Sequence, residues 1–309
     1  MTAYIIRRVL WLIPVLLVVT MITFALMHAA PGGPFDSAGQ GGRRLPEAVT
    51  RNLEAQYGLD DPIPVQYVRW VGNLLVGDFG PSYNYRNRTV NDILFQGLPA
   101  SVQLGTMAFL LSVILGIPLG VIGALRQNKW PDYLATTVSV IGIATPSFII
   151  SVFLQLIVAV NLGWFPTGGW RGPQYWVLPT IALSGFAIAS IARYTRASML
   201  EVTRRDYVRT AQSKGLKERS VVIVHMIRNA LIPVITILGP IFAFLVTGSL
   251  IIETIFTVPG IGAFYISASG SRDYGLIMAL TVLFAVTIAV MNLVVDIAYA
   301  YIDPRIRYS

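Results

Sequence analysis

The polar and apolar positions of this chain are arranged in long blocks. Six blocks have almost no charge and are long enough, at about 17 residues or more, for an α-helix to cross the hydrocarbon core of a bilayer. They are residues 9–27, 99–125, 133–160, 176–192, 229–252 and 274–301. Asp296 alone lies well inside a block. The pattern predicts an all-α membrane protein with six transmembrane helices.

The first block follows Arg7 and Arg8 and contains 19 residues. The apolar core of a cleaved signal peptide has about 7 to 15 residues and is followed by a small-x-small cleavage site. No such site follows this block. We therefore expect the first helix to be retained in the protein.

The overall composition also indicates a membrane protein. Of the 309 residues, 55% are hydrophobic and 12% are charged, whereas soluble domains have about 25% charged residues. So few charges cannot cover the surface of a soluble protein of this length. The chain has no cysteine, which excludes a disulfide framework.

Basic residues predict the orientation of the helices. Fifteen of the 23 lysines and arginines fall in four segments: residues 7–8, 126–129, 193–228 and 305–307. The positive-inside rule places these segments in the cytoplasm, together with both termini. The chain then divides into residues 1–29 (cytoplasmic start and first helix), 30–98 (external), 99–302 (helices two to six, with the cytoplasmic loop 193–228) and 303–309 (cytoplasmic tail).

The external segment 30–98 has six arginines and seven acidic residues. This balance does not favour a nucleic-acid-binding arm. Its pattern predicts two short amphipathic helices, one over residues 46–57 and one containing residues 67–75. Two interpretations are open: a small lid or docking surface, and a compact connection without contacts of its own.

Several kinds of chemistry are missing from the sequence. None of the three lysines, Lys129, Lys214 and Lys217, belongs to a Gly-Lys-Ser/Thr phosphate-binding loop. His28 and His225 lie on opposite predicted sides of the membrane, so we expect no metal site. The single intramembrane Asp296 does not favour ion-driven transport, and we expect it to pair with Arg193 or Arg196. We therefore expect the chain not to be an enzyme.

The loop 193–228 combines nine basic and three acidic residues with helix-forming composition. Gly215 interrupts it, and glycine accepts the left-handed geometry that ends one helix and lets another leave at a steep angle. One interpretation is a polybasic segment that lies on anionic lipid. The other is a rigid elbow, two short helices meeting at Gly215, that docks on a cytoplasmic partner.

The loop is similar to the cytoplasmic signature of permease subunits of ABC importers, in residues 206–216 (DYVRTAQSKGL) and 228–233 (RNALIP). Further fragments, in order along nearly the whole chain, resemble the B-type permease of dipeptide and oligopeptide importers. They are residues 30–34, 77–80, 116–120, 145–148, 196–199, 253–256, 259–262 and 302–307. Residues 80–83 (GPSY) and 164–170 (WFPTGGW) look more like the oligopeptide branch.

The resemblance implies a type I ABC importer permease fold in a bacterial or archaeal plasma membrane. It implies these partners: a homologous C-type permease, two cytoplasmic ATPases that bind ATP and Mg²⁺, an external peptide-binding protein, and a peptide as cargo. The chain itself would bind no cofactor. The elbow would transmit ATPase movement through Asp206, Tyr207, Arg209, Thr210, Ala211, Gly215 and Leu216, with Ala211 and Gly215 small for close approach.

Two further sets of residues are candidates within this resemblance. Uncharged polar residues inside the blocks are candidates for a translocation path, or equally for helix-to-helix hydrogen bonds: Gln103, Thr106, Thr145, Ser147, Gln155, Thr247, Thr281 and Asn292. The connection after the fifth block is either a re-entrant external gate or a turn packed on the external segment. Its candidate residues are Glu253, Pro259, Gly260 and Gly262.

Other functions remain open at this level. Within the same family, nickel is a competing cargo. Outside it, a homo-oligomeric channel or an ion-driven carrier would need no ATPase, and a membrane anchor would bind a cytoplasmic partner but transport nothing.

Overall fold

The computed structural model describes residues 2–35, 46–85 and 87–302, and these form helices and loops without a β-sheet. The all-α prediction is therefore confirmed. The predicted tail 303–309, with Arg305 and Arg307, lies outside the described residues. The helices are α1 (Thr2–Ala29), α2 (Glu47–Tyr57), α3 (Ile63–Leu75), α4 (Val90–Leu125), α5 (Trp130–Ala144), α6 (Ser147–Phe153), η1 (Leu154–Asn161, a π-helix), α7 (Pro173–Thr203), α8 (Asp206–Ser213), α9 (Glu218–Ser220), η2 (Val221–Ile227, a π-helix), α10 (Arg228–Val246), α11 (Leu250–Ile255), α12 (Gly262–Ser271) and α13 (Tyr274–Ile302).

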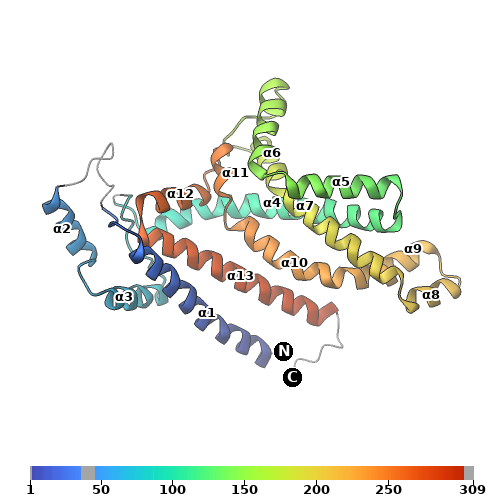
Figure 1. Ribbon diagram of the computed structural model, residues 1–309, viewed down its shortest axis with the longest axis horizontal. Coiled ribbons are helices and arrows are strands. Elements are labelled where there is room, and N and C mark those ends of the chain that lie inside the picture. Colours follow the sequence, from blue (N-terminus) through green and yellow to red (C-terminus); the bar gives the residue numbers. More distant parts are fainter. Residues whose placement is uncertain (1, 36–45, 86, 303–309) are drawn as a thin grey trace.

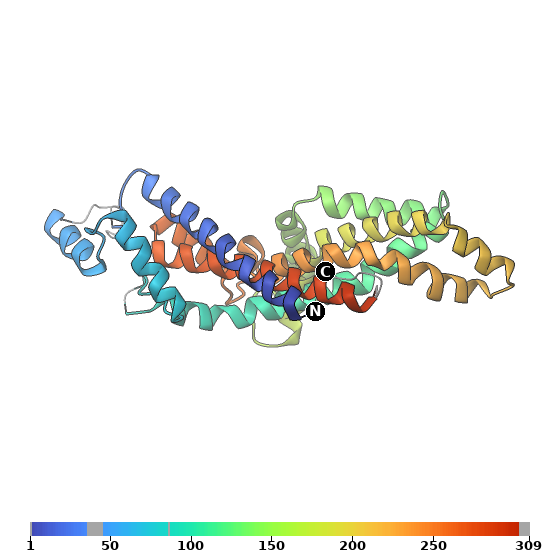
Figure 2. The same ribbon diagram turned by 90° about the horizontal axis from the view of Figure 1, so that it is seen from below.

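The long helices run side by side, and the short helix α6 projects from the middle of this bundle (Figure 1). α2 and α3 lie at one end, and α8 and α9 lie at the other, as the perpendicular view also shows (Figure 2). α1 packs beside α13. We call these the α3 end and the α8 end.

Five helices are long and apolar enough to span a membrane among the described residues, or six spans result if a bent pair counts as one. The bent pair, α5 with α6 and η1, covers the span expected over 133–160, and its bend is 102°. The break lies at Thr145, which precedes Pro146 and has an extended ψ of 118°. A residue before proline is disfavoured in the α-helical region, which explains the break.

α4 begins nine residues before the expected start at residue 99. Its N-terminus is a capping box: the Thr89 hydroxyl accepts from Asp92 N at 3.1 Å, and the Asp92 carboxylate accepts from Thr89 N at 3.0 Å. These bonds satisfy amide groups that the first helical turn leaves free. The polar start has low hydropathy, so a search for apolar residues misses it.

Small residues let α4 pack closely against its neighbours. A Cβ atom at Gly120 would lie 2.5 Å from the backbone oxygen of Ala192 in α7, and one at Gly105 would lie 2.3 Å from that of Leu245 in α10. Only glycine fits such contacts, which are typical of helices packed in membranes. α4 is thus held tightly between α7 and α10.

The expected partner of Asp296 is wrong. Asp296 pairs with Arg8 of α1 at 3.0 Å. Arg196 instead pairs with Asp132 of α5, through contacts of 2.5 and 2.8 Å. The reason is the helix arrangement, because α13 lies beside α1 whereas α7 lies beside α4 and α5.

Candidate functional site

The α8 end carries an elbow made of α8, the turn 214–217, α9 and η2 (Figure 1). Gly215 has a φ of +73°. Its N–H donates to the Gln212 carbonyl at 2.9 Å, and the Leu216 N–H donates to the Ala211 carbonyl at 3.4 Å. These bonds end α8 as in common glycine caps. A Cβ at Gly215 would meet no atom within 4 Å, so the left-handed backbone, not crowding within the chain, requires glycine.

The inner face of the elbow is packed on the membrane helices. Val208 and Ala211 are buried, with 1% and 5% of their surface exposed. They belong to one apolar cluster with Met199 of α7, Met226 of η2 and other residues of α4, α7 and α10. Ala211 was expected to be small for contact with a partner, but its side chain lies inside this chain. The elbow is therefore joined to α7 and α10 through an apolar core.

The outer face of the elbow contains the other residues predicted for coupling. All six are exposed, with Tyr207 at 40% and Leu216 at 43%. They are Asp206, Tyr207, Arg209, Thr210, Gly215 and Leu216. An exposed, mixed apolar and charged surface on a rigid support is suited to binding another protein.

The segment between α10 and α12 is organised around Glu253, which is only 1% exposed. Its carboxylate accepts from the Ser101 hydroxyl at 2.7 Å, from Gly262 N at 2.6 Å and from Ser249 N at 3.2 Å. The Ser101 oxygen in turn accepts from Ile261 N at 2.9 Å. Glu253 thus joins α11 to α4 and to the start of α12.

The other candidate gate residues surround this carboxylate or lie beside it. A Cβ at Gly260 would lie 2.4 Å from Glu253 Oε2, and one at Gly262 would lie 2.6 Å from it. Pro259 is exposed. The Phe256 carbonyl, just before this turn, accepts from Gly169 N at 2.8 Å. The segment therefore packs on the loop before α7 and on α4, including the part of α4 that belongs to the external segment 30–98. A Cβ at Gly97 would lie 3.1 Å from the Gly260 carbonyl carbon, and Ile261 shares an apolar cluster with Val90 and Ile93. These contacts agree with the interpretation of a turn packed on the external segment.

The structure does not gather the eight candidate path residues into one cavity. Ser147 and Thr247 line one cavity of about 340 Å³, and Thr281 and Asn292 line another of about 480 Å³. Gln103, Thr106 and Thr145 are partly buried in α4 and at the α5–α6 break.

Three of the path candidates already use their polar atoms within the chain. The Thr247 and Thr281 hydroxyls donate to backbone oxygens one turn earlier, at 2.8 Å each, and Gln155 Nε2 donates to the Thr167 carbonyl at 2.7 Å. The two threonines thus bond within their own helices, and Gln155 bonds to the loop before α7.

A protein-family model decides the family. The model for the "Binding-protein-dependent transport system inner membrane component" matches residues 116–308, and the model for the N-terminal part of such membrane components matches residues 1–105. The chain belongs to this family. It is a multi-pass inner membrane protein.

Relatives of this inner membrane component match over the whole chain. The oligopeptide transport system permease protein OppB of Salmonella typhimurium is 44% identical over 310 residues, with 100% of both chains covered. OppB of Escherichia coli is 45% identical with the same coverage. The dipeptide transport system permease protein DppB of Bacillus subtilis is 45% identical over 99% of this chain and 98% of its own.

Chains of two solved transporters have a fold similar to that of this chain. The MetNI methionine ABC transporter, in an inward-facing conformation, has a chain that matches with a TM-score of 0.58 at 16% identity, covering 68% of this chain and 96% of that one. A chain of an amino acid ABC transporter matches with a TM-score of 0.54 at 16% identity, covering 68% and 94%. The ABC importer permease fold is thereby confirmed.

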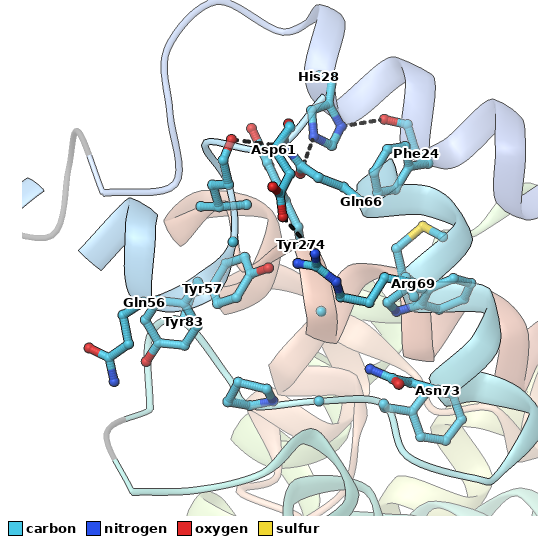
Figure 3. A pocket seen from close by; sticks show the side chains of 18 of the residues that line it. Phe24, His28, Gln56, Tyr57, Asp61, Gln66, Arg69, Asn73, Tyr83 and Tyr274 are labelled. Carbon is cyan, nitrogen blue, oxygen red and sulfur yellow. Dashed lines mark hydrogen bonds and ion pairs between the residues drawn. The ribbon is translucent and has the colours of Figure 1, made fainter. Parts of the chain in front are cut away.

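The sequence did not reveal a cavity of about 420 Å³ at the α3 end of this inner membrane component (Figure 3). α1, α2, α3, the loop 79–83 and α13 line it. His28 lies beside Gln66, with 3.3 Å between His28 Nε2 and Gln66 Oε1, and Asp61 pairs with Arg69 at 2.7 Å (Figure 3). These residues come from separate segments, so no single motif could indicate the cavity.

A second feature missed by the sequence is the buried Asp273, which precedes α13. Its carboxylate accepts from the Ser82 hydroxyl, from Asn84 N at 3.2 Å and from Leu276 N at 3.2 Å. It therefore caps α13 and fixes the loop 82–85 of the segment 30–98. Burial, together with this carboxylate, raises the pKa of the neighbouring Tyr83.

Proposed function

We propose that this chain is the membrane-spanning permease subunit of an ATP-driven, binding-protein-dependent importer of peptides, with oligopeptides as the main cargo. The observation that carries this proposal is the end-to-end identity of 44–45% with proteins named as oligopeptide transport permeases. The identity to a dipeptide permease is similar, at 45%. The cargo class is therefore peptides, and the experiment below measures their length.

The chain transmits movement and does not hydrolyse ATP in this proposal. Two separate ATPase subunits bind ATP and Mg²⁺, and the outer face of the elbow docks on one of them. The packed inner face supports this role, because Val208 and Ala211 join the elbow to α7 and α10 without a flexible linker. Force applied at Tyr207 or Leu216 would then tilt these helices as one body.

The passage for the peptide is shared with a second, homologous permease subunit. Two separate cavities, one at Ser147 and Thr247 and one at Thr281 and Asn292, support half of a path here rather than a complete channel. Apart from Arg8, which pairs with Asp296, the residues that line these cavities are uncharged, which is suited to cargo with variable side chains. In this proposal the α8 end and both termini are cytoplasmic, which the positive-inside rule supports, and the α3 end faces the peptide-binding protein.

The proposal is tested in proteoliposomes that contain this chain, a candidate partner permease and two ATPases, with the binding protein outside. We expect a labelled pentapeptide to accumulate only with ATP and binding protein, and a labelled dipeptide to accumulate less. Accumulation of Ni²⁺ instead of peptide would reassign the cargo. Transport by the isolated chain without ATP would overturn the importer itself.

A further inference from the structure

A groove of about 410 Å³ runs between α4, α5 and α7 near the α8 end. Its walls are mostly small or apolar residues, and its polar and charged members are few. The lining residues that matter here are Gly120 of α4, Ala135, Ser139 and Val140 of α5, and Arg193 of α7. The groove lies apart from the elbow surface, the Glu253 segment and the candidate path residues described above.

The groove has one charged end and one apolar end. Arg196 lines it at the level of Asp132, with which it forms an ion pair, and Arg193 lines it one turn earlier on α7. Ile143 and Ala144 line it farther along α5. At 1.5 Å per residue, these two sets lie about 17 Å apart along α5, roughly half the thickness of a hydrocarbon core. This is the polarity of one leaflet, with the charge at the surface and the apolar part toward the bilayer centre.

The two arginines differ in what they offer a ligand. The Arg196 guanidinium is committed to Asp132, whose side chain is 4% exposed. Arg193 is exposed and takes part in none of the ion pairs found among the described residues. Arg126 and Lys129, at the turn between α4 and α5, lie at the same end but do not line the groove. Arg193 is therefore the lining group that favours an anion.

Aromatic side chains mark the same end as a membrane surface. Trp130 is 75% exposed, Tyr133 is 63% exposed and Tyr194 is 46% exposed. Exposed tryptophan and tyrosine are enriched at the level of lipid headgroups. Basic pockets between membrane helices at this level bind anionic headgroups. The charge and the apolar groove thus occur together where a lipid would present a phosphate and an acyl chain.

We propose that this groove binds one anionic phospholipid, with its phosphate at Arg193 and one acyl chain between α5 and α7. The bound lipid fills the groove beside Ala135, Ser139 and Val140 and supports α7, the helix that leads to the elbow. A helix of a second permease is the competing occupant. A second helix is disfavoured because it would bury the Arg193 guanidinium against apolar side chains. Burying a charge without an anion as partner costs free energy. This proposal does not depend on the identity of the cargo.

The test uses native mass spectrometry of the full chain, purified with its co-expressed partner subunits from nanodiscs of phosphatidylglycerol and phosphatidylethanolamine. We expect the wild type to retain one phosphatidylglycerol for each copy of this chain. Arg193→Gln removes the headgroup contact, and Val140→Trp fills the groove from an exposed position. Each should lower retention at least fivefold.

Matched controls distinguish lipid binding in this groove from a general attraction of anionic lipid to basic residues. Arg126→Gln removes a charge at the same end, and Val138→Trp adds the same bulk on α5, and neither residue lines the groove. Both should retain the lipid as the wild type does. The proposal is overturned if Arg126→Gln loses as much phosphatidylglycerol as Arg193→Gln, or if Arg193→Gln retains it as the wild type does. It is also overturned if a Val140→Cys variant forms a cross-link to another subunit.

Discussion

Ser101 and Glu253 are 152 residues apart in the sequence, and the Ser101 hydroxyl donates to Glu253 Oε1 at 2.7 Å. Both side chains are buried. The Ser101 oxygen also accepts from Ile261 N, and the other Glu253 oxygen accepts from Gly262 N. The two residues therefore fix the turn 256–261 against α4, which makes this segment a rigid support in the observed conformation. If it acts as a gate, these bonds are the ones that must break.

The first prediction concerns the loss of this acceptor. Glu253→Ala leaves the Ser101 hydroxyl and two backbone N–H groups without their partner. An unsatisfied buried donor costs about 1–3 kcal/mol. We expect a clear drop in the melting temperature of the detergent-solubilised complex, measured by fluorescence-detected size-exclusion chromatography after heating. Thr254→Ala, at the exposed neighbouring residue, should melt as the wild type does; an equal drop in both would contradict this role of Glu253.

The second prediction concerns the space around the same carboxylate. A Cβ at Gly260 would lie 2.4 Å from both Glu253 Oε2 and Ser101 Oγ. Gly260→Ala must therefore displace these groups, and overpacking of this kind costs about 1–3 kcal/mol. Gly270→Ala is the matched control, because a Cβ there would meet nothing within 4 Å. We expect Gly260→Ala to lower the melting temperature and peptide uptake, and Gly270→Ala to change neither.

Hydropathy predicted the bundle well, because each membrane helix must satisfy its backbone within one long apolar segment. Hydropathy did not predict the helix boundaries that local residues set. The capping box starts α4 at Val90, and Pro146 breaks the helix at the residue before it. The elbow could be predicted because Gly215 interrupts a helical pattern within a few residues.

The contacts of the candidate sites could not be predicted in the same way. The Ser101–Glu253 bond and the Arg8–Asp296 pair join residues far apart in sequence, and a single serine or aspartate does not indicate its partner. The expected Asp296 pairing with Arg193 or Arg196 failed because charge alone does not say which helices are neighbours. The inward position of Ala211 was missed because both faces of a helix as short as α8 contain small residues.

The third prediction separates backbone geometry from side-chain size at the elbow. Gly215 has a φ of +73° and open space around it. Asparagine tolerates this conformation, whereas a β-branched residue is strongly disfavoured in it. We expect Gly215→Asn to keep ATP-dependent peptide uptake and Gly215→Val to reduce it several-fold, with both variants inserted in the membrane. Co-purification of the ATPases with each variant shows whether docking or transmission is lost. Wild-type uptake by Gly215→Val would remove this turn from the coupling mechanism.

The last prediction concerns the pair that holds α5 to α7. Arg196 binds both oxygens of Asp132, at 2.5 and 2.8 Å, and Asp132 also accepts from Asn128 N at 2.9 Å. Asp132→Asn weakens both contacts while keeping the shape. Breaking a buried pair costs about 3–5 kcal/mol, and because the Arg196 side chain is 29% exposed we expect about half of that here.

This pair is tested by thermal melting of three variants. Arg196→Lys keeps the charge but cannot form the two parallel bonds, so it should melt between the wild type and Asp132→Asn. Arg193→Lys, one turn earlier and exposed, should melt as the wild type does in lipid-free detergent. Because Asp132 also fixes the turn between α4 and α5, its variant should increase protease cleavage after Arg126 or Lys129, which Arg196→Lys should not. If Asp132→Asn melts as the wild type does, the pair contributes nothing to stability, and α5 is held by its apolar contacts alone.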